Sequence, residues 1–420
     1  MLRIILGTTG SKFLIAVLGF LVVLLNTRYL GAEGFGTIGL IGLAITIILL
    51  FNNFIGGTAL IYLASREDMF KLLVPGYVWA FIISIVFSII IRFLRMVPSE
   101  FEFHVVLLSL IFSLAGVNLN LLLGKEKIRA FNIITVLQSG IQLISLIVLF
   151  FILHRISIIS FVITLYISFL LTLLLSSISL ARIIKPSDLG DIKEVIKRIF
   201  HFGSYIQVAY TLQLFNYRMS YYIIDHFLGR ASVGMFHFGN QLAEGTWVIG
   251  RSIATVQYAK VSNTTDLVYA RKLSLNMLKL TFLVSTVMVL GFLIIPESVF
   301  HFFGKDFGKT RIIMLSLGVG IIANACSMMF SHYFAGLGKP HFNTIASAIG
   351  LVFTLTFGFI LIPRYGIIGA GFTATISYTL SMIYQFFTFF WFSGAKFKEI
   401  LISRSDIDMV KKELKLLFNS

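Results

Sequence analysis

Two short stretches decide the fold, because each joins two long apolar segments and the two read almost alike. They lie 198 positions apart and read Tyr29-Leu30-Gly31-Ala32-Glu33-Gly34-Phe35-Gly36 and Phe227-Leu228-Gly229-Arg230-Ala231-Ser232-Val233-Gly234. Without a gap, the second, third and eighth positions are identical in the two stretches. Such an echo within a very apolar chain is typical of a transporter built from two repeated lobes, with its substrate path between them.

The composition around these stretches predicts a polytopic membrane protein. Hydrophobic residues make up 58% of the chain and charged residues only 12%, whereas soluble domains carry about 25% charged residues. Apolar runs of about twenty residues recur along the chain, and a helix of that length crosses a hydrocarbon core of about 30 Å. All 6 prolines lie at or near the edges of these runs, which favours helices over the short alternating strands of a barrel.

The hydropathy pattern predicts an all-α fold with twelve transmembrane helices in two six-helix lobes. Because each lobe has an even number of helices, both lobes share one orientation, and their pseudo-twofold axis runs along the membrane normal. Residues 1–182 form the N-terminal lobe, 183–200 a cytoplasmic amphipathic linker, 201–393 the C-terminal lobe and 394–420 a cytoplasmic tail. The twelve spans are expected at about 6–28, 36–63, 74–96, 103–123, 132–153, 157–182, 201–227, 232–258, 273–295, 311–335, 343–362 and 367–392.

The linker and the loop charges predict the topology. Residues 186–200 place Ile192, Val195, Ile196 and Ile199 on one face and charges on the other, a pattern typical of a helix lying on a membrane surface. With the N-terminus inside, inner segments carry 22 of the 34 Lys and Arg residues, outer segments carry 9, and 3 lie within helices. By the positive-inside rule, both termini are therefore expected in the cytoplasm.

Soluble-enzyme chemistry is missing from the sequence. We find no metal-ligand spacing, no phosphate-binding loop and no nucleophilic triad, and no outer loop is long enough for an extracellular catalytic site. We therefore expect no catalytic residues, no metal site and no enzyme activity. The net charge of +16 is explained by the inner loops rather than by nucleic-acid binding.

Charged residues inside the predicted spans are the candidate functional residues. Arg218, Glu244, Arg251 and Lys279 lie well inside spans, where a charge facing lipid at the helix centre costs about 2.5–3.5 kcal/mol. Asn240, Glu244 and Arg251 share one helical face of the eighth span, and Gln207 shares a face of the seventh span with Arg218. A purely structural ion pair between Glu244 and an arginine is the alternative, and Lys279 lies close enough to the cytoplasmic edge to snorkel.

Guanidinium groups at this depth favour an anionic, pyrophosphate-bearing substrate, because arginine grips phosphate with a planar fork and stays charged when partly desolvated. We therefore predict a substrate-binding set and one ion-coupling residue. The binding set is Arg218, Arg251, Asn240, Gln207 and Lys279, and Glu244 is the residue expected to couple Na+ or H+. No other cofactor is expected.

Four stretches give the chain a resemblance to a known family: 28–36, Phe215-Asn216-Tyr217-Arg218 with 227–229, Gly336-Leu337-Gly338-Lys339-Pro340, and 362–371. Their order resembles the bacterial O-antigen and capsule-unit flippases of the multidrug/oligosaccharidyl-lipid/polysaccharide exporter superfamily. The resemblance implies a twelve-helix, two-lobe protein that flips undecaprenyl-pyrophosphate-linked oligosaccharides across the cytoplasmic membrane by alternating access, for surface polysaccharide such as lipopolysaccharide. Many relatives carry an acid two positions after the arginine, where this chain has Ser220, which leaves Glu244 as the better ion-coupling candidate.

The expected partners are a lipid-linked oligosaccharide, the bilayer of the bacterial inner membrane and other polysaccharide-assembly membrane proteins. Two alternatives stay open. A cation-coupled multidrug antiporter would carry acids in the first lobe's helices, and none is seen there. A membrane-embedded glycan polymerase would need a long outer loop with catalytic groups. A peptidoglycan-precursor flippase is the nearest rival by chemistry, and its relatives usually carry extra helices and arginines in the first spans.

Overall fold

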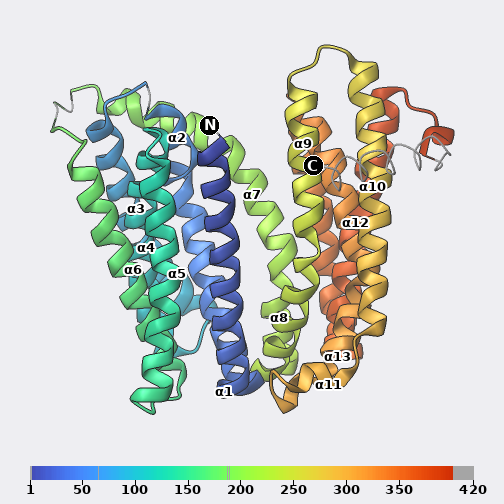
Figure 1. The fold of residues 1–420 in the computed structure, drawn as a ribbon, viewed down its shortest axis with the longest axis horizontal. Coiled ribbons are helices and arrows are strands. Elements are labelled where there is room, and N and C mark those ends of the chain that lie inside the picture. Colours follow the sequence, from blue (N-terminus) through green and yellow to red (C-terminus); the bar gives the residue numbers. More distant parts are fainter. Residues whose placement is uncertain (1, 65, 187, 189, 401–420) are drawn as a thin grey trace. The chain divides into compact units, whose positions relative to one another are not determined.

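The computed structural model describes residues 2–64, 66–186, 188 and 190–400, with the side chains of all of these except residues 2–9, 58, 202–206, 259 and 293. No strand occurs among the described residues, so the all-helical prediction is confirmed. Part of the predicted tail, residues 401–420, lies outside the described residues. The elements in Figure 1 are α1 (Leu2–Gly56), α2 (Thr58–Leu63), α3 (Met69–Leu94), η1 (Ser99–Phe101), α4 (Glu102–Gly124), α5 (Ile128–Ile147), η2 (Val148–Ile152), α6 (Ile158–Ala181), α7 (Ile192–Leu228), α8 (Arg230–Gly245), α9 (Trp247–Ser262), α10 (Leu267–Ile294), α11 (Glu297–His301), η3 (Lys305–Lys309), α12 (Thr310–Gly336), α13 (His341–Ser393) and η4 (Phe397–Ile400).

Each of the twelve predicted spans falls on a described helix or on consecutive helices. Among the described residues, eight helical segments are long and apolar enough to cross a membrane, and two of them, Gly10–Leu63 and His341–Ser393, are 54 and 53 residues long. Those two lengths are about twice what one crossing needs. A non-helical glycine divides each long helix, Gly31 with φ 66° in α1 and Gly366 with φ 61° in α13. Glycine adopts this left-handed conformation without a steric penalty. The number of crossings and the lobe symmetry stay predictions.

The eighth predicted span covers two helices, α8 and α9, which are separated by one residue whose backbone stays helical: Thr246, with φ −65° and ψ −24°. Helix α8 ends at Gly245 and α9 begins at Trp247, with Thr246 between them. The Thr246 hydroxyl donates a hydrogen bond of 2.8 Å to the Ala243 carbonyl, and glycine before it has a low helix propensity. The interruption places Glu244 at the end of one helix and Arg251 in the next.

Contacts divide the chain into two compact units, which are described separately. Unit 1 consists of residues up to Thr211 together with Gly229–Met235 and His301–Phe307, and unit 2 consists of Leu212–Leu228, Phe236–Phe300 and the residues from Gly308 onward. The lobe, linker and tail boundaries expected from the sequence stay a prediction.

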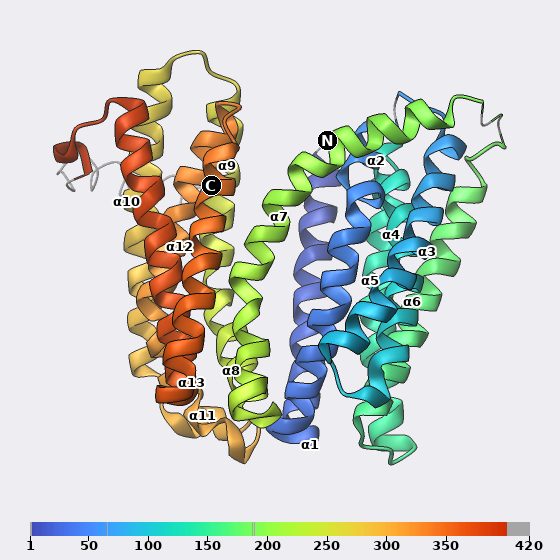
Figure 2. The same cartoon turned by 180° about the vertical axis from the view of Figure 1, so that it is seen from behind.

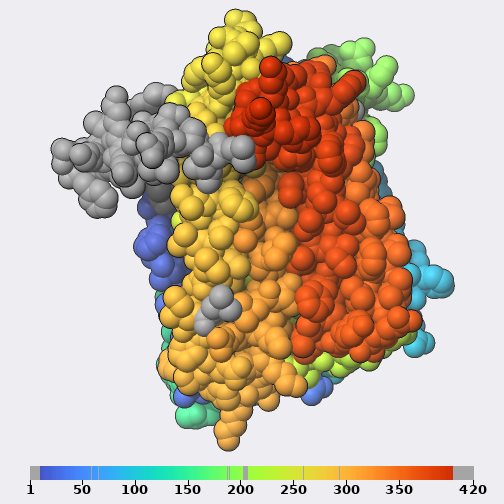
Figure 3. Space-filling model, turned by 90° about the vertical axis from the view of Figure 1, so that its right-hand side faces the viewer, coloured from blue at the N-terminus to red at the C-terminus, as the bar shows by residue number. Residues whose placement is uncertain are grey.

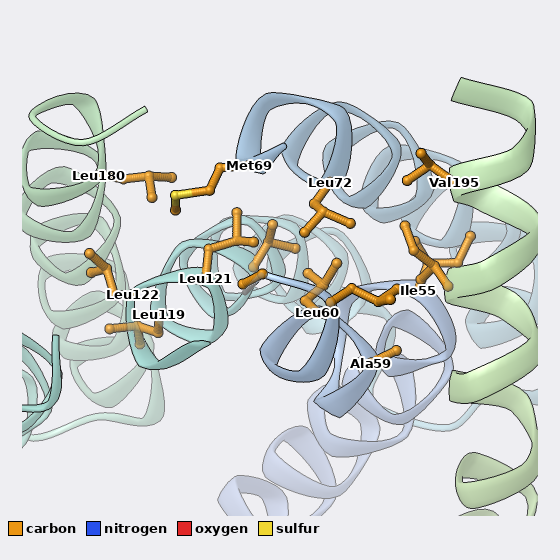
Figure 4. Close-up of a cluster of buried hydrophobic side chains, with 14 of the residues drawn as sticks. Ile55, Ala59, Leu60, Met69, Leu72, Leu119, Leu121, Leu122, Leu180 and Val195 are labelled. Atoms are coloured by element: carbon orange, nitrogen blue, oxygen red, sulfur yellow. The ribbon is translucent and has the colours of Figure 1, made fainter. Parts of the chain in front are cut away.

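The core of unit 1 includes a cluster contributed by the seven helices α1 to α7, with Ile134 from α5. Side chains of α1, α2, α3, α4, α6 and α7 converge on one another in Figure 4, where Leu60, Leu72 and Leu121 are fully buried. Val195 and Ile199, from the first turns of α7, belong to this cluster and are also buried. In a membrane protein, such packing is stabilised by van der Waals contact rather than by removal of apolar surface from water.

The amphipathic segment expected as a surface linker is therefore the first part of α7, and half of its apolar face packs on protein. Figure 2 shows this part of α7 running across α2 and α3. Ion pairs fix the segment at both ends of its first turns: Asp191 lies 3.7 Å from Lys71, and Arg198 lies 2.6 Å from Glu67. Ile196 on the same helix is exposed.

Unit 2 contains a second core, built by α9, α10, α12 and α13. It is rich in aromatic rings: Phe330, Tyr333, Phe334 and Phe389 are buried in it. Cys326 is buried in the same cluster, in agreement with a packing role. Figure 3 views unit 2 from the side that α10, α12 and α13 cover. These helices also expose large apolar side chains, as expected for helices in lipid: Phe282, Val287, Val319 and Val352.

The two echoed stretches contact each other within unit 1. A Cβ added at Gly36 would overlap the Arg230 carbonyl oxygen, and a Cβ added at Gly234 would overlap the Ala32 carbonyl oxygen. Each added Cβ would also lie 2.8 Å from the backbone nitrogen of the other glycine. Since Gly36 aligns with Gly234 and Ala32 with Arg230, the contact is reciprocal. The sequence echo thus marks a crossing of two helices at a distance that only glycine permits.

Candidate functional site

Two of the charges predicted at bilayer depth form an ion pair in unit 2. The guanidinium of Arg218 on α7 donates from Nη1 to Glu244 Oε1 at 3.0 Å and from Nη2 to Glu244 Oε2 at 2.9 Å. This is the planar, two-bond arrangement that arginine makes with a carboxylate. The pair is not sealed, because the Arg218 side chain is 26% exposed and the Glu244 side chain 16% exposed.

Neutral polar groups orient the pair. Asn240, one turn before Glu244 on α8, donates from Nδ2 to Glu244 Oε1 at 2.8 Å and to the Tyr221 hydroxyl at 3.0 Å. The Tyr221 hydroxyl also accepts a 2.9 Å bond from Arg218 Nη1. His237 Nδ1 lies 3.3 Å from the same hydroxyl. We call these five residues the pair cluster: Arg218, Glu244, Asn240, Tyr221 and His237.

A buried amide holds α7 in the position that presents Arg218. Asn216 Oδ1 accepts hydrogen bonds from Thr354 at 2.8 Å and from Ser377 at 2.6 Å, both on α13. Gly350 lies directly over the Asn216 amide, so a larger residue there would displace it. Because Asn216 is two residues before Arg218, the side chains point in different directions around α7. The amide therefore faces α13, and the guanidinium faces α8.

Arg251 has a different environment from Arg218. Its side chain is exposed, and no carboxylate of a described residue is recorded within ion-pair distance of it. The guanidinium carbon lies 6.0 Å from the ring centroid of Trp247, one turn earlier on α9. Trp247 is buried and fixed by a 3.3 Å hydrogen bond from its indole nitrogen to the Ile321 carbonyl. Arg251 is therefore a cation held by an aromatic face rather than by an opposite charge.

The structure brings together only some of the predicted site residues. Arg218, Glu244 and Asn240 are hydrogen-bonded, and Arg251 follows on α9. Gln207 is buried and belongs to unit 1, so it is not part of the cluster. Lys279 lies half-buried on α10 of unit 2. The binding and ion-coupling roles of all six stay predictions.

Sequence reasoning missed Tyr221 and His237, although helical spacing could have found them. Tyr221 lies three residues after Arg218, and His237 lies seven residues before Glu244, so each shares a helical face with its charged neighbour. It also missed Tyr378 and Asn324, and no sequence signal links these to the site. The Tyr217 hydroxyl donates a 3.0 Å bond to Asn324 on α12, and the Tyr217 ring packs edge-on against Tyr378 on α13.

The described side chains include no group of three or more His, Cys, Asp or Glu residues that could hold a metal ion. The pair cluster instead contains five polar groups that contact one another: a guanidinium, a carboxylate, an amide, a phenol and an imidazole. Such a set can bind and release an anion or a proton.

No family model matches the chain. Among curated relatives, it is 24% identical over 169 residues to the capsular polysaccharide biosynthesis protein CapF of Staphylococcus aureus, a match that covers 39% of this chain and 43% of CapF. It is 22% identical over 215 residues to a Shigella flexneri protein whose name assigns it as an O-antigen transporter, covering 51% of each. The chain thus spans about half the length of the curated relatives it matches.

Solved structures match over nearly the whole chain. An inward-facing multidrug resistance MATE family transporter of the MOP superfamily aligns with a TM-score of 0.71 at 18% identity, covering 90% of this chain and 94% of the other. The lipid II flippase MurJ, in an inward closed conformation, aligns with a TM-score of 0.72 at 16% identity, covering 92% and 87%. The chain shares the fold of these two proteins. This fold and the apolar helices make it a multi-pass membrane protein, and the proteins that it resembles are named as transporters and flippases rather than as enzymes.

Proposed function

We propose that this protein translocates undecaprenyl-pyrophosphate-linked oligosaccharides across the bacterial cytoplasmic membrane by alternating access, for surface polysaccharide synthesis. The names of the capsule and O-antigen relatives support the substrate class, and the fold supports a transport function. The positive-inside distribution of Lys and Arg supports a cytoplasmic position for both termini.

The observation that carries the proposal is Arg251. An arginine that is exposed on an otherwise apolar protein, without a recorded carboxylate partner, is costly unless it meets water or an anion. The phosphate groups of a pyrophosphate match the planar guanidinium, which can bind them through two parallel hydrogen bonds. The polar headgroup must be shielded from hydrocarbon during its passage, because unpaired polar groups cost several kcal/mol each there, on the order of 4–8 for water to cyclohexane.

Glu244 is proposed as the residue that couples the cycle to Na+ or H+. Its carboxylate is partly exposed and can exchange Arg218 for a proton or a cation. Replacement by glutamine keeps the shape and removes the charge. If export in Glu244→Gln cells depends on the ion gradient as it does in the wild type, the coupling role is wrong.

Deleting the gene and identifying the accumulated lipid tests the function. We expect one undecaprenyl-pyrophosphate oligosaccharide to accumulate on the inner leaflet and surface glycan to disappear. Arg218→Ala and Arg251→Ala should fail to restore glycan although the protein reaches the membrane, whereas Arg92→Ala, at an exposed position on α3, should restore it. Full glycan display by both site variants would disprove the anion-binding role.

The MATE similarity makes a multidrug antiporter the second candidate. It predicts that the deletion strain becomes sensitive to cationic drugs and keeps its surface glycan. If the lipid-linked peptidoglycan precursor accumulates instead, the result would indicate a lipid II flippase, which is what MurJ is named.

A further inference from the structure

The fork of Arg218 is already occupied. Nη1 donates to Oε1 of Glu244 and Nη2 donates to Oε2, and Nη1 also donates to the Tyr221 hydroxyl. A phosphate would bind the same edge of the guanidinium with the same two parallel hydrogen bonds. An anionic headgroup can therefore reach this edge only when the carboxylate leaves it.

Replacing the Glu244 carboxylate on Arg218 by another anion costs less free energy than separating the pair without a replacement. A buried arginine left without a counter-charge is strongly unfavourable, but it stays compensated if an incoming phosphate takes the place of the carboxylate. The displaced carboxylate is not left alone either, because Asn240 donates to its Oε1 from the same helix. The pair is also partly exposed on both sides, so an incoming group can reach it.

Arg251 is free for a first contact. It lies seven residues after Glu244, is exposed, and is held over the Trp247 ring by a contact that leaves its hydrogen-bond donors available. The two arginines thus differ in one respect that matters for binding: among the described residues, Arg218 is paired with a carboxylate and Arg251 is not.

We propose that Glu244 is an internal substitute for the substrate's headgroup, which displaces it from Arg218 after docking on Arg251. This deepens the function proposed above and rests on it. The exchange selects for an anion that offers two oxygens to the two terminal nitrogens of Arg218, as a phosphate does. A phosphate-free prenyl alcohol has no group that can displace the carboxylate.

The test is a double-mutant cycle on the purified full-length chain, with farnesyl pyrophosphate as the probe and calorimetric binding as the measurement. Glu244→Gln should bind the probe about tenfold more tightly than the wild type, because a neutral amide competes weakly for Arg218. In an Arg218→Gln background, the same change should give no gain, because the fork is absent. Non-additivity of this kind isolates the interaction between the two side chains.

Matched variants separate exchange from general electrostatics. Glu297→Gln removes the same charge at an exposed position on α11 and should leave affinity unchanged. A gain in Glu244→Gln that persists in the Arg218→Gln background would overturn the proposal, as would unchanged or weaker binding by Glu244→Gln with an unaltered melting temperature. If Glu244→Gln is poorly folded, Glu244→Asp, which is expected to bind more tightly than wild type by a smaller factor, decides the question.

The outcomes also separate this proposal from the transport function. If the wild-type protein binds farnesyl pyrophosphate and restores surface glycan but the cycle is additive, only the exchange is wrong. If the wild-type protein neither binds the probe nor restores glycan, the transport proposal fails, and the exchange fails with it. Under every outcome, substitution of Arg218 or Glu244 should not change the binding of farnesol.

Discussion

The hydrogen-bond network around Asn118 in unit 1 is neutral, whereas the network around Arg218 in unit 2 is charged. In unit 1, Asn118 accepts a 2.8 Å bond from the Tyr77 hydroxyl and donates to Ser176 at 3.2 Å and to Ser177 at 3.0 Å. In unit 2, the corresponding role of joining helices is taken by Arg218 and Glu244 with Asn240 and Tyr221. A neutral network with every bond made holds helices together. A partly exposed ion pair is a weak source of stability, so we expect the charged network of unit 2 to serve the anion chemistry.

The ion pairs of unit 1 lie elsewhere. Glu67 pairs with Arg198, and Lys71 pairs with Asp191, where the first turns of α7 meet the short stretch between α2 and α3. These contacts fix one helix to the unit. Ion pairs therefore have two roles in this protein. In unit 1 they hold a helix in place, and in unit 2, by our proposal, the ion pair exchanges one anion for another.

The largest effect on stability is expected from Glu244→Leu, because it leaves Arg218 partly buried without its counter-charge. We expect a loss of about 3 kcal/mol in the free energy of unfolding, measured by thermal unfolding in detergent. Adding Arg218→Met should restore most of this stability, since a neutral pair of similar volume packs without desolvation cost. Neither variant should export glycan. Export by the double variant would mean that the pair serves packing alone.

Asn118→Ala is expected to cost about 1–3 kcal/mol, because it removes the acceptor of the Tyr77 hydroxyl and the amide bonds to Ser176 and Ser177. The activity of the protein that does reach the membrane should stay close to wild type. Surface glycan normalised to the amount of membrane-inserted protein checks this. A large loss of activity per molecule would show that the neutral network does more than join helices.

Glu67→Gln removes the Arg198 ion pair, which is half-exposed on the arginine side, and should cost about 0.5 kcal/mol. The cost should decrease in high salt. Val195→Ala on the same helix face should cost more, about 1 kcal/mol or above, because its side chain is buried. Equal costs for the two would mean that charge, and not apolar packing, holds the start of α7.

Arg251→Ala should have the smallest effect on stability, within about 0.5 kcal/mol, because the side chain is exposed. Its effect on export should be large, a decrease of at least about tenfold, which corresponds to 1.4 kcal/mol in binding. Arg251→Lys should keep part of the activity, since lysine retains the charge but not the planar fork. Normal export by Arg251→Ala would remove the main support for the anionic substrate.

The membrane class and the helical fold could be predicted from composition and periodicity, because lipid leaves a helix few alternatives. The placement of Arg218, Asn240 and Glu244 on facing helical stripes was also predictable, since helical spacing fixes which residues share a face. The interruption at Thr246 and the burial of Val195 and Ile199 could not be predicted. The sequence pattern shows that a helix face is apolar, but it does not show which residues pack on that face.

The sequence by itself determined that this chain is a bundle of apolar helices with a few charges at bilayer depth and two matching glycine stretches. Only the tertiary structure decided that those stretches cross at Gly36 and Gly234, that Arg218 is paired with a carboxylate 26 positions away, and that Arg251 is left to an aromatic ring. These effects act over different distances along the chain. Hydrophobicity and helix formation depend on neighbours within a turn or two, whereas the partner of a charge depends on which helices pack together.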